Sequence, residues 1–310
     1  MTYTFPKMFL AGGVTTLRTA GTIEGHTELT VKRFIDRGKM AGPTVFVISP
    51  HLDGSPYIPQ LPYLKEGQDP ALLVDYWADQ GVSSVRAYMN LRRDELEGFV
   101  DAAHQNGKIS RTLLDLPRES QEMEELMQHL IDQDMATTTT PPVFELCTNR
   151  EVVHGGGLKA FAPGIQRLVL NHYADGVNRD SASRVLFNKE LYWIKKFHDM
   201  GGHLVVGADP TGAGRTLAGY ANQHTVEVLR EAGFSIREAI HVATLCGAEH
   251  LGIDDRTGSL ETGKEADLVI MEGNLKEDVS NIRRMEIVFK DGVGFDSGKL
   301  FRSLEGKVGL

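Results

Sequence analysis

Cysteine and long apolar runs are scarce in this chain. Only two of its 310 residues are cysteines, Cys147 and Cys246, and they stand far apart with no CxxC or Cys/His spacing. The sequence therefore indicates neither a disulfide framework nor a thiolate zinc site. No run approaches the ~18 apolar residues of a membrane span, and residues 1–13 lack the pattern of a secretory leader. We expect a cytoplasmic protein with no membrane partner and with both cysteines buried as small apolar side chains.

An excess of positive charge is also missing. The chain has 33 Lys and Arg against 42 Asp and Glu, a net charge of -9. Without a basic field, binding to nucleic acid or to an anionic membrane surface is not expected, whereas a small-molecule substrate remains open. The sequence contains no HxH, HExxH, GxSxG, P-loop or strand-linked GxGxxG motif. These absences argue against serine hydrolases, nucleoside triphosphatases and dinucleotide-binding enzymes.

Short β-branched runs alternate with longer helix-like segments, which predicts βα units and a parallel sheet. The runs are GVTTLRTAG (13–21), TVFVISP (44–50), SSVRAYM (83–89), MATTTT (135–140) and HLVVGAD (203–209). This α/β pattern fits an open doubly wound sheet or a closed (β/α)8 barrel equally well, because periodicity does not distinguish them.

Helical period predicts helices over residues 71–81, 93–107, 121–133, 183–202 and 236–252. Gly81, Gly107 and Gly201 stand where a left-handed residue closes a helix. Ser235 and Glu238 have the spacing of a capping box at the start of the last of these helices.

The pattern changes after Gly258. Two strand-like segments, ADLVIM (266–271) and MEIVFKDGV (285–293), are separated by a polar stretch. They predict a small β appendage outside the parallel sheet. We therefore expect a barrel-type domain over 1–258 and a β-sandwich segment over 259–310.

Catalytic residues of parallel α/β folds lie at the carboxyl ends of the strands, so the strand ends are the places to look. Asp209 ends an apolar strand before a Pro/Gly loop, where a carboxylate can bind a metal or act as a general base. Its alternative role is an N-cap. His51 is a weaker candidate for lining a pocket, since its surroundings also read as a turn-rich surface loop. Tyr88 and His224 complete the predicted substrate-binding set.

Four segments carry a family resemblance: GVTTLRTAG, residues 75–108, GGHLVVGADPTG and TGSLETGKEADLVIMEGN. They resemble the metal-dependent amidohydrolase superfamily, in its imidazolonepropionase and Xaa-Pro dipeptidase (prolidase)-like branch. The resemblance implies a TIM-like (β/α)8 barrel with a small β-sandwich. It also implies an enzyme with one or two divalent metal ions, usually zinc, that hydrolyses C–N bonds of an amide, dipeptide or cyclic amide. Asp209 matches the aspartate that binds metal and takes the proton of the attacking water.

The family's other metal ligands are not matched. Arg86 stands at the position of the bridging lysine, and arginine stays protonated, so a lysine-bridged pair of metals is in doubt. The HxH motif of the first strand and the histidines of strands 5 and 6 have no counterpart, and His129 lies inside a predicted helix. The barrel is thus expected to be incomplete. An incomplete barrel exposes strand edges, which favours a homo-oligomer over a monomer.

Three explanations remain open. The sequence omits residues of the whole molecule, with joins before Met8 and near Ser110; or it is a remnant without catalysis; or it is a divergent protein with a rebuilt core. The leading hypothesis is a metallohydrolase that uses Asp209. Its rival is a non-catalytic scaffold or binding protein that has lost the metal site.

Overall fold

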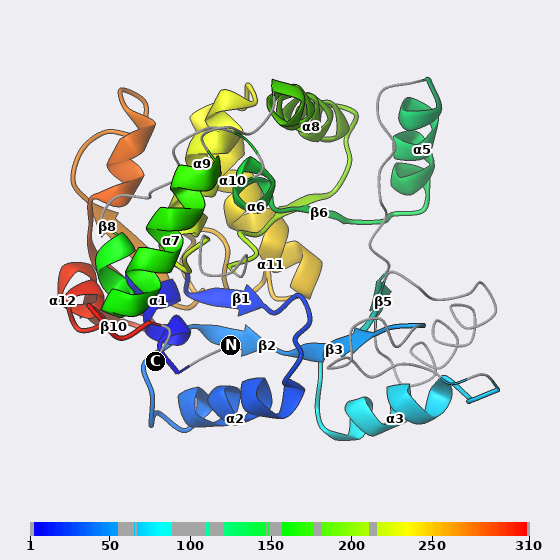
Figure 1. Cartoon of the computed structure of the whole chain (residues 1–310), viewed down its shortest axis with the longest axis horizontal. Helices are drawn as coiled ribbons and strands as arrows, with labels where there is room; N and C mark the ends of the chain where they lie inside the picture. The colour runs from blue at the N-terminus through cyan, green and yellow to red at the C-terminus, as the bar shows by residue number, and fades with distance from the viewer. Residues whose placement is uncertain are drawn as a thin grey trace. The chain divides into compact units, whose positions relative to one another are not determined.

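The computed structural model describes residues 3–54, 65, 67–88, 109–111, 121–146, 148, 157–176, 181–210 and 216–308 (Figure 1). Its contacts divide the chain into two units. The first contains Met1–Pro6 and Thr16–Leu116, and the second contains Lys7–Thr15 and Pro117–Leu310. Each unit has a hydrophobic core of its own.

The first unit alternates strands and helices. Its elements are β1 (Thr16–Arg18), α2 (Gly25–Asp36), β2 (Thr44–Phe46), β3 (Ile48–Leu52), α3 (Ala71–Asp79), β4 (Ser84–Ala87) and β5 (Ile109–Arg111). The predicted helix over 93–107 and its closing residue Gly107 lie outside the described residues.

The described strand pairs of the first unit are all parallel. β1 pairs with β2, and β3 pairs with β4, which pairs with β5. The segment that follows β1 runs beside β3, where the His51 backbone N–H donates to the carbonyl of Thr22 at 3.4 Å. β5 passes through Ser110 in a single register with β4. The predicted parallel pairing is confirmed for these runs, with the 44–50 run divided at Val47 into β2 and β3.

Two helices cover one face of these strands. Figure 1 shows α2 and α3 running along the same side of β2 and β3. Leu29 of α2 and Trp77 of α3 pack against Val45, Leu52 and Val85 of the strands in one buried cluster. Val85 therefore faces the helices, and its neighbour Arg86 leaves the sheet on the other face.

The second unit is mostly helical. Its elements are α1 (Phe5–Ala11), α5 (Gln121–Asp132), β6 (Thr137–Thr139), α6 (Pro141–Glu145), η1 (Gly157–Ala160), α7 (Pro163–Gly176), α8 (Ser181–Asp199), β7 (Leu204–Val206), α9 (Tyr220–Glu231), α10 (Ile236–Ala243), α11 (Leu245–Leu251), β8 (Leu268–Met271), η3 (Val279–Arg283), β9 (Met285–Lys290), β10 (Val293–Asp296) and α12 (Ser297–Arg302). The first two residues of α1 are counted with the first unit.

β6 and β7 form a parallel pair, as the alternating pattern predicts. The described strands of the chain thus build a mixed α/β fold in separate short sheets, and they do not close into a barrel. Within the described ranges, no helix has the length and apolar character needed to cross a membrane.

The two predicted C-terminal segments pair in a small sheet. β8 lies within ADLVIM and pairs antiparallel with β9, and the order of the sheet is β10, β9, β8. The second predicted segment, 285–293, is not one strand, because it turns at Asp291 and Gly292 and β10 begins at Val293. Beside this sheet the Lys290 ammonium lies 3.0 Å from the carboxylate of Asp267. The predicted domain boundary after Gly258 remains a prediction.

Helix ends follow the glycines. Gly81 and Gly201 adopt positive φ angles of 88° and 89° two residues after the last residues of α3 and α8, which confirms their role as helix stops. The single helix predicted over 236–252 is wrong. It divides into α10 and α11 at Thr244, whose φ of -130° and ψ of -80° interrupt the helical backbone.

The N-terminal segment packs into the second unit through close backbone contacts. A Cβ at Gly12 would overlap the backbone of Gly219, and one at Gly13 would lie 2.6 Å from the sulfur of Met285. The Ser297 hydroxyl donates to the carbonyl of Ala11 at 2.7 Å. Residues near the start and the end of the chain therefore share one unit. Cys246 is buried and free, as expected, and Cys147 lies outside the described residues.

The capping box at α10 generates a stability prediction. The Ser235 side chain accepts from the Glu238 N–H at 3.2 Å, and the Glu238 carboxylate accepts from the Ser235 N–H at 2.6 Å. Ser235→Ala should lower the free energy of unfolding by about 1 kcal/mol because one backbone donor loses its acceptor. Urea denaturation measures this change. Ser235→Thr, which keeps the hydroxyl, is the control, and equal losses in both variants would contradict the capping role.

Candidate functional site

An extra residue in β3 shapes the strand ends of the first unit. Ile48 pairs with Ser84 and His51 with Arg86, so three steps along β3 match two along β4. At this bulge the Ser49 hydroxyl replaces a backbone acceptor: it accepts from the Arg86 N–H at 2.9 Å and donates to the Pro50 carbonyl at 2.9 Å. Bulges of this kind redirect side chains. Here the bulge brings His51 level with Arg86.

His51 lies in a strand and not in the surface loop that its sequence also allowed. Its ring is half-buried and packs against the ring of Tyr88, with centroids 4.4 Å apart. Among the described residues its Nδ1 is buried without a hydrogen-bond partner. Burial, and then the charge of Arg86, lower the pKa of His51 to about 4, with Asp53 acting in the opposite direction. His51 is therefore a neutral imidazole at pH 7.

Arg18 brings a second guanidinium to the same part of the unit. It is the last residue of β1, and burial followed by the charge of Arg86 lowers its pKa to about 10. Arg18 nevertheless stays protonated at pH 7. Gly21, with φ of 99°, allows the side chains to meet: a Cβ there would lie 2.6 Å from His51 Nδ1 and 2.8 Å from Arg86 Cδ. We call Arg18, His51 and Arg86 the cationic cluster.

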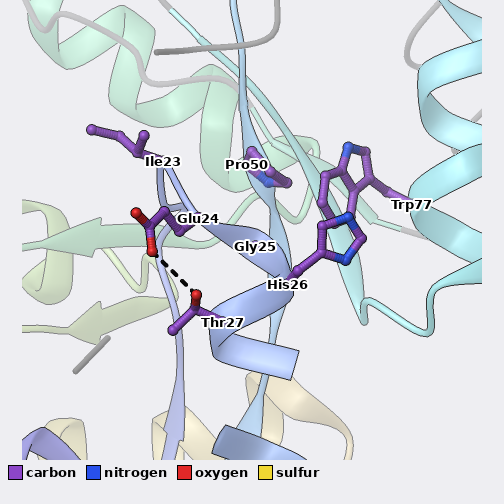
Figure 2. Close-up of a pocket in the computed structure, with 7 residues that line it drawn as sticks. All are labelled: Ile23, Glu24, Gly25, His26, Thr27, Pro50 and Trp77. Atoms are coloured by element: carbon purple, nitrogen blue, oxygen red, sulfur yellow. Dashed lines mark hydrogen bonds between the residues drawn. The ribbon is translucent and has the colours of Figure 1, made fainter. Parts of the chain in front are cut away.

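An apolar cavity of about 490 Å³ lies on the helix side of the same strands. It is lined by residues 23–27, Pro50 and Trp77 (Figure 2). His26 lies against Trp77 with ring centroids 4.9 Å apart, and the hydroxyl of Tyr76 is 3.0 Å from His26 Nε2. Pro50 faces this cavity, whereas the next residue, His51, meets Gly21 and Arg86. The cavity and the cationic cluster are therefore distinct features.

Asp209 follows β7 in the second unit with a left-handed φ of 41°. Aspartate adopts this conformation more readily than most residues, although it still costs energy there. The hydroxyl of Thr216 donates to the Asp209 carbonyl oxygen at 2.9 Å, and the residue is half-buried. The next described helix is α9, and Gly219 is its N-cap. Residues 211–215 lie outside the described residues, so the predicted alternative, an N-cap at Asp209 for the following turn or helix, remains a prediction.

A second carboxyl group lies at the neighbouring strand end. Glu190 of α8 is hydrogen-bonded to Thr139, the last residue of β6, and burial raises the pKa of Glu190 to about 7 against the opposing effect of that hydrogen bond. The Gly207 N–H donates to the Thr139 carbonyl at 2.9 Å, so these positions adjoin the chain that leads to Asp209. A carboxyl group with this pKa can exchange a proton at neutral pH.

His224 is held between two carboxylates. Its Nε2 lies 2.6 Å from Glu145 and its Nδ1 2.7 Å from Glu227, and Arg283 pairs with Glu227 on the other side. Because carboxylates only accept hydrogen bonds, both ring nitrogens donate and the imidazole is charged. Burial alone would lower the pKa of His224, but the two carboxylates raise it. The hydrogen bonds from His224 and Arg283 likewise outweigh burial and bring the pKa of Glu227 to about 2.

This chain of charges joins three elements of the second unit. Glu145 ends α6, His224 and Glu227 lie on α9, and Arg283 ends η3. With both ring nitrogens occupied by protein groups, His224 holds elements together in this structure. Its predicted role in substrate binding remains a prediction.

The described residues do not assemble the expected metal site. Two groups of possible ligands lie close enough to share one ion: His198, Asp199 and Glu238, and Glu265, Asp267 and Asp291. The first stands before β7, at the opposite end of that strand from Asp209. In the second, the Lys290 ammonium already neutralises Asp267 and Asp291, at 3.0 and 2.7 Å. Neither group contains Asp209, and Arg86 is a cation beside a second cation.

Arg86 lies in β4 and Tyr88 directly follows it, at the strand end where the sequence places them. His51, whose surroundings also read as a surface loop, lies beside them in β3. Sequence reasoning did not find Glu190 or the partners of His224. A buried glutamate inside a helical pattern, and a histidine paired with a residue 79 positions away, leave no local signal. Asp209 and Arg86 belong to different units, and their predicted roles in metal binding remain predictions.

Comparison with known proteins identifies the family. The model of the Amidohydrolase family matches residues 91–294, more than half of the chain. The chain belongs to the amidohydrolase family. This membership confirms the resemblance seen in the sequence and supports an enzyme.

Individual relatives agree with this family. The chain is 40% identical to guanine deaminase of Escherichia coli K12 over 90 residues, 28% of this chain and 19% of that protein. It is 48% identical to imidazolonepropionase of Picrophilus torridus over 44 residues, 14% of this chain and 11% of that protein. The chain thus matches only a small part of the length of these curated relatives.

Solved structures show the fold. A Xaa-Pro dipeptidase crystallised with methionine in its active site is similar over 94% of this chain and 77% of its own, with a TM-score of 0.71 and 19% identity. This amidohydrolase fold is of the TIM-barrel type, which supports the predicted fold class, although the described strands of this chain form separate sheets.

The His224 chain of charges generates a pH prediction. Glu145→Gln removes one carboxylate, so the pKa of His224 should fall. A histidine whose pKa is higher in the folded state stabilises that state at pH values below its unfolded pKa of about 6.5. This stabilisation disappears as the pH rises through the folded pKa. The variant should therefore lose about 1–3 kcal/mol at pH 5.5 and less at high pH.

Urea denaturation from pH 5.5 to 9, with an NMR titration of His224, measures both effects. The control is Glu272→Gln, which removes the exposed partner of Arg284 and should cost less than about 1 kcal/mol at every pH. A loss for Glu145→Gln that does not change with pH would contradict a charged His224.

Proposed function

We propose that this protein hydrolyses C–N bonds of a small substrate, an amide, a dipeptide or a cyclic amide. Membership of the amidohydrolase family supports the reaction class, and the similarity to a Xaa-Pro dipeptidase supports the fold on which it takes place. The observation that carries the proposal is the position of Asp209. A half-buried carboxylate follows a parallel strand at its carboxyl end, where active sites of this fold are built.

Asp209 is proposed to take the proton from the attacking water. A carboxylate that accepts this proton increases the nucleophilicity of the water as it adds to the carbonyl carbon. The left-handed backbone at Asp209 and the hydrogen bond from Thr216 to its carbonyl fix the point from which the side chain leaves the strand end. Glu190, with its pKa near 7, is the second described carboxyl group at this edge able to move a proton.

Metal dependence is a separate proposal. The amidohydrolase family generally depends on divalent metal ions, which supports one or two ions, with zinc expected, in this protein. The described residues do not supply a matching set of ligands beside Asp209. Element analysis of the purified protein tests the proposal: one or two equivalents of zinc per chain are expected, and a metal-free protein with full activity would refute it.

The rival proposal is a non-catalytic scaffold or binding protein. Two features support it. Arg86 stands at the position of the family's lysine, and its charge acts on a second cation, Arg18. A cytoplasmic location, a homo-oligomeric state and substrate binding by His51, Tyr88 and His224 remain predictions under either proposal.

Asp209→Asn tests the catalytic role. The amide keeps the shape of the carboxylate but cannot accept the proton, so kcat should fall by about 10² to 10⁴. Turnover is measured on a panel of amides, dipeptides and cyclic amides. The matched control is Asp134→Asn, which makes the same change at another left-handed aspartate, with φ of 52°, in an exposed turn after α5.

The control should keep full turnover. Equal turnover of Asp209→Asn and the parent on every substrate that the parent hydrolyses would refute the role of Asp209. A parent that hydrolyses nothing in the panel and contains no metal would favour the scaffold.

A further inference from the structure

Arg18 is the group of the cationic cluster whose charge lacks a balancing acid. Burial and the like charge of Arg86 lower the pKa of Arg18, and no acidic group of the described residues contributes to this shift. In the described part of the chain, the Arg18 side chain has no hydrogen bond or ion pair. Asp53 is the acid whose charge acts on His51, and its Oδ1 accepts from the Gly54 N–H at 2.8 Å. A half-buried guanidinium beside a like charge is costly unless an anion balances it.

The cluster also holds an unused hydrogen-bonding atom. Nδ1 of His51 is buried and has no partner among the described residues, although it lies beside Gly21 and near the Arg86 side chain. The bulge at Ser49 and the missing side chain at Gly21 are the two backbone features that allow this arrangement. A neutral imidazole can donate from one ring nitrogen, so Nδ1 is available to an acceptor oxygen.

We propose that Arg18, His51 and Arg86 bind a small oxyanion, a carboxylate or a phosphate, at the carboxyl ends of β1, β3 and β4. Planar guanidinium groups match the paired oxygens of both ligands, and two of them supply the charge. Binding would satisfy Nδ1 of His51 and balance Arg18. The site lies within the first unit, so it does not depend on the proposed hydrolysis or on Asp209.

The proposal is tested by titrating the full-length protein with inorganic phosphate and, separately, with succinate at constant ionic strength. Isothermal calorimetry and the shift in unfolding temperature report binding. We expect saturable binding of at least one probe by the parent. Binding of phosphate alone assigns a phosphoryl ligand, and binding of succinate alone assigns a carboxylate ligand. No saturable binding of either would overturn the proposal.

Arg18→Gln is the decisive variant. It should weaken binding at least tenfold, while its unfolding temperature without ligand stays equal or rises, because the repulsion by the like charge of Arg86 is removed. A merely structural Arg18 would give the opposite, a lower unfolding temperature with unchanged affinity, and that result would overturn the proposal. Arg37→Gln, the same change at an exposed residue after α2, should leave affinity unchanged.

A second variant keeps the test decisive if Arg18→Gln does not fold. Arg18→Lys retains the charge but loses the planar fork, so binding should weaken by a smaller factor. The proposal would also be overturned if Arg18→Lys bound the probes with the affinity of the parent and Arg86→Gln left this affinity unchanged.

Discussion

One extra residue in β3 determines which side chains of the first unit face the helices and which face the cationic cluster. The bulge between Ile48 and His51 places Pro50 against Trp77 on the helix side and His51 against Arg86 on the other side. The Ser49 hydroxyl makes this possible because it completes the ladder where the backbone cannot. The apolar cavity and the cationic cluster both result from this single irregularity. Bulges persist beside functional sites for the same reason, since they redirect one side chain without dissolving the sheet.

The strand ends of the two units differ in charge. The first unit presents Arg18 and Arg86 with a neutral His51, whereas the second presents Asp209 and a glutamic acid, Glu190, with a pKa near 7. A divalent metal needs anionic or neutral ligands, and it competes with guanidinium groups for the same carboxylates. The arginine at the position of the family's lysine therefore changes which class of ligand the first unit can accept, even though the fold is retained.

Local signals in the sequence predicted the fold better than the site. Gly81, Gly201 and the Ser235 and Glu238 pair act on their own backbone, so short windows contain the information. The bulge in β3 escaped because Pro50, Asp53 and Gly54 are typical of turns, and only pairing with β4 makes this segment a strand. The break of the last long helix at Thr244 also escaped, because helical periodicity continues across an exposed residue with a non-helical backbone.

The N-terminal segment of the second unit has a consequence for how the molecule is made. Residues 7–15 are synthesised long before their partners, which include Gly219 and Ser297, and the bond from Ser297 to Ala11 spans 286 residues. Closing a loop of that length in an unfolded chain costs on the order of 5 kcal/mol. The first unit lies inside this loop, and its earlier folding would shorten the chain that remains to be closed. Vectorial synthesis thus favours completion of the first unit before the second can assemble with residues 7–15.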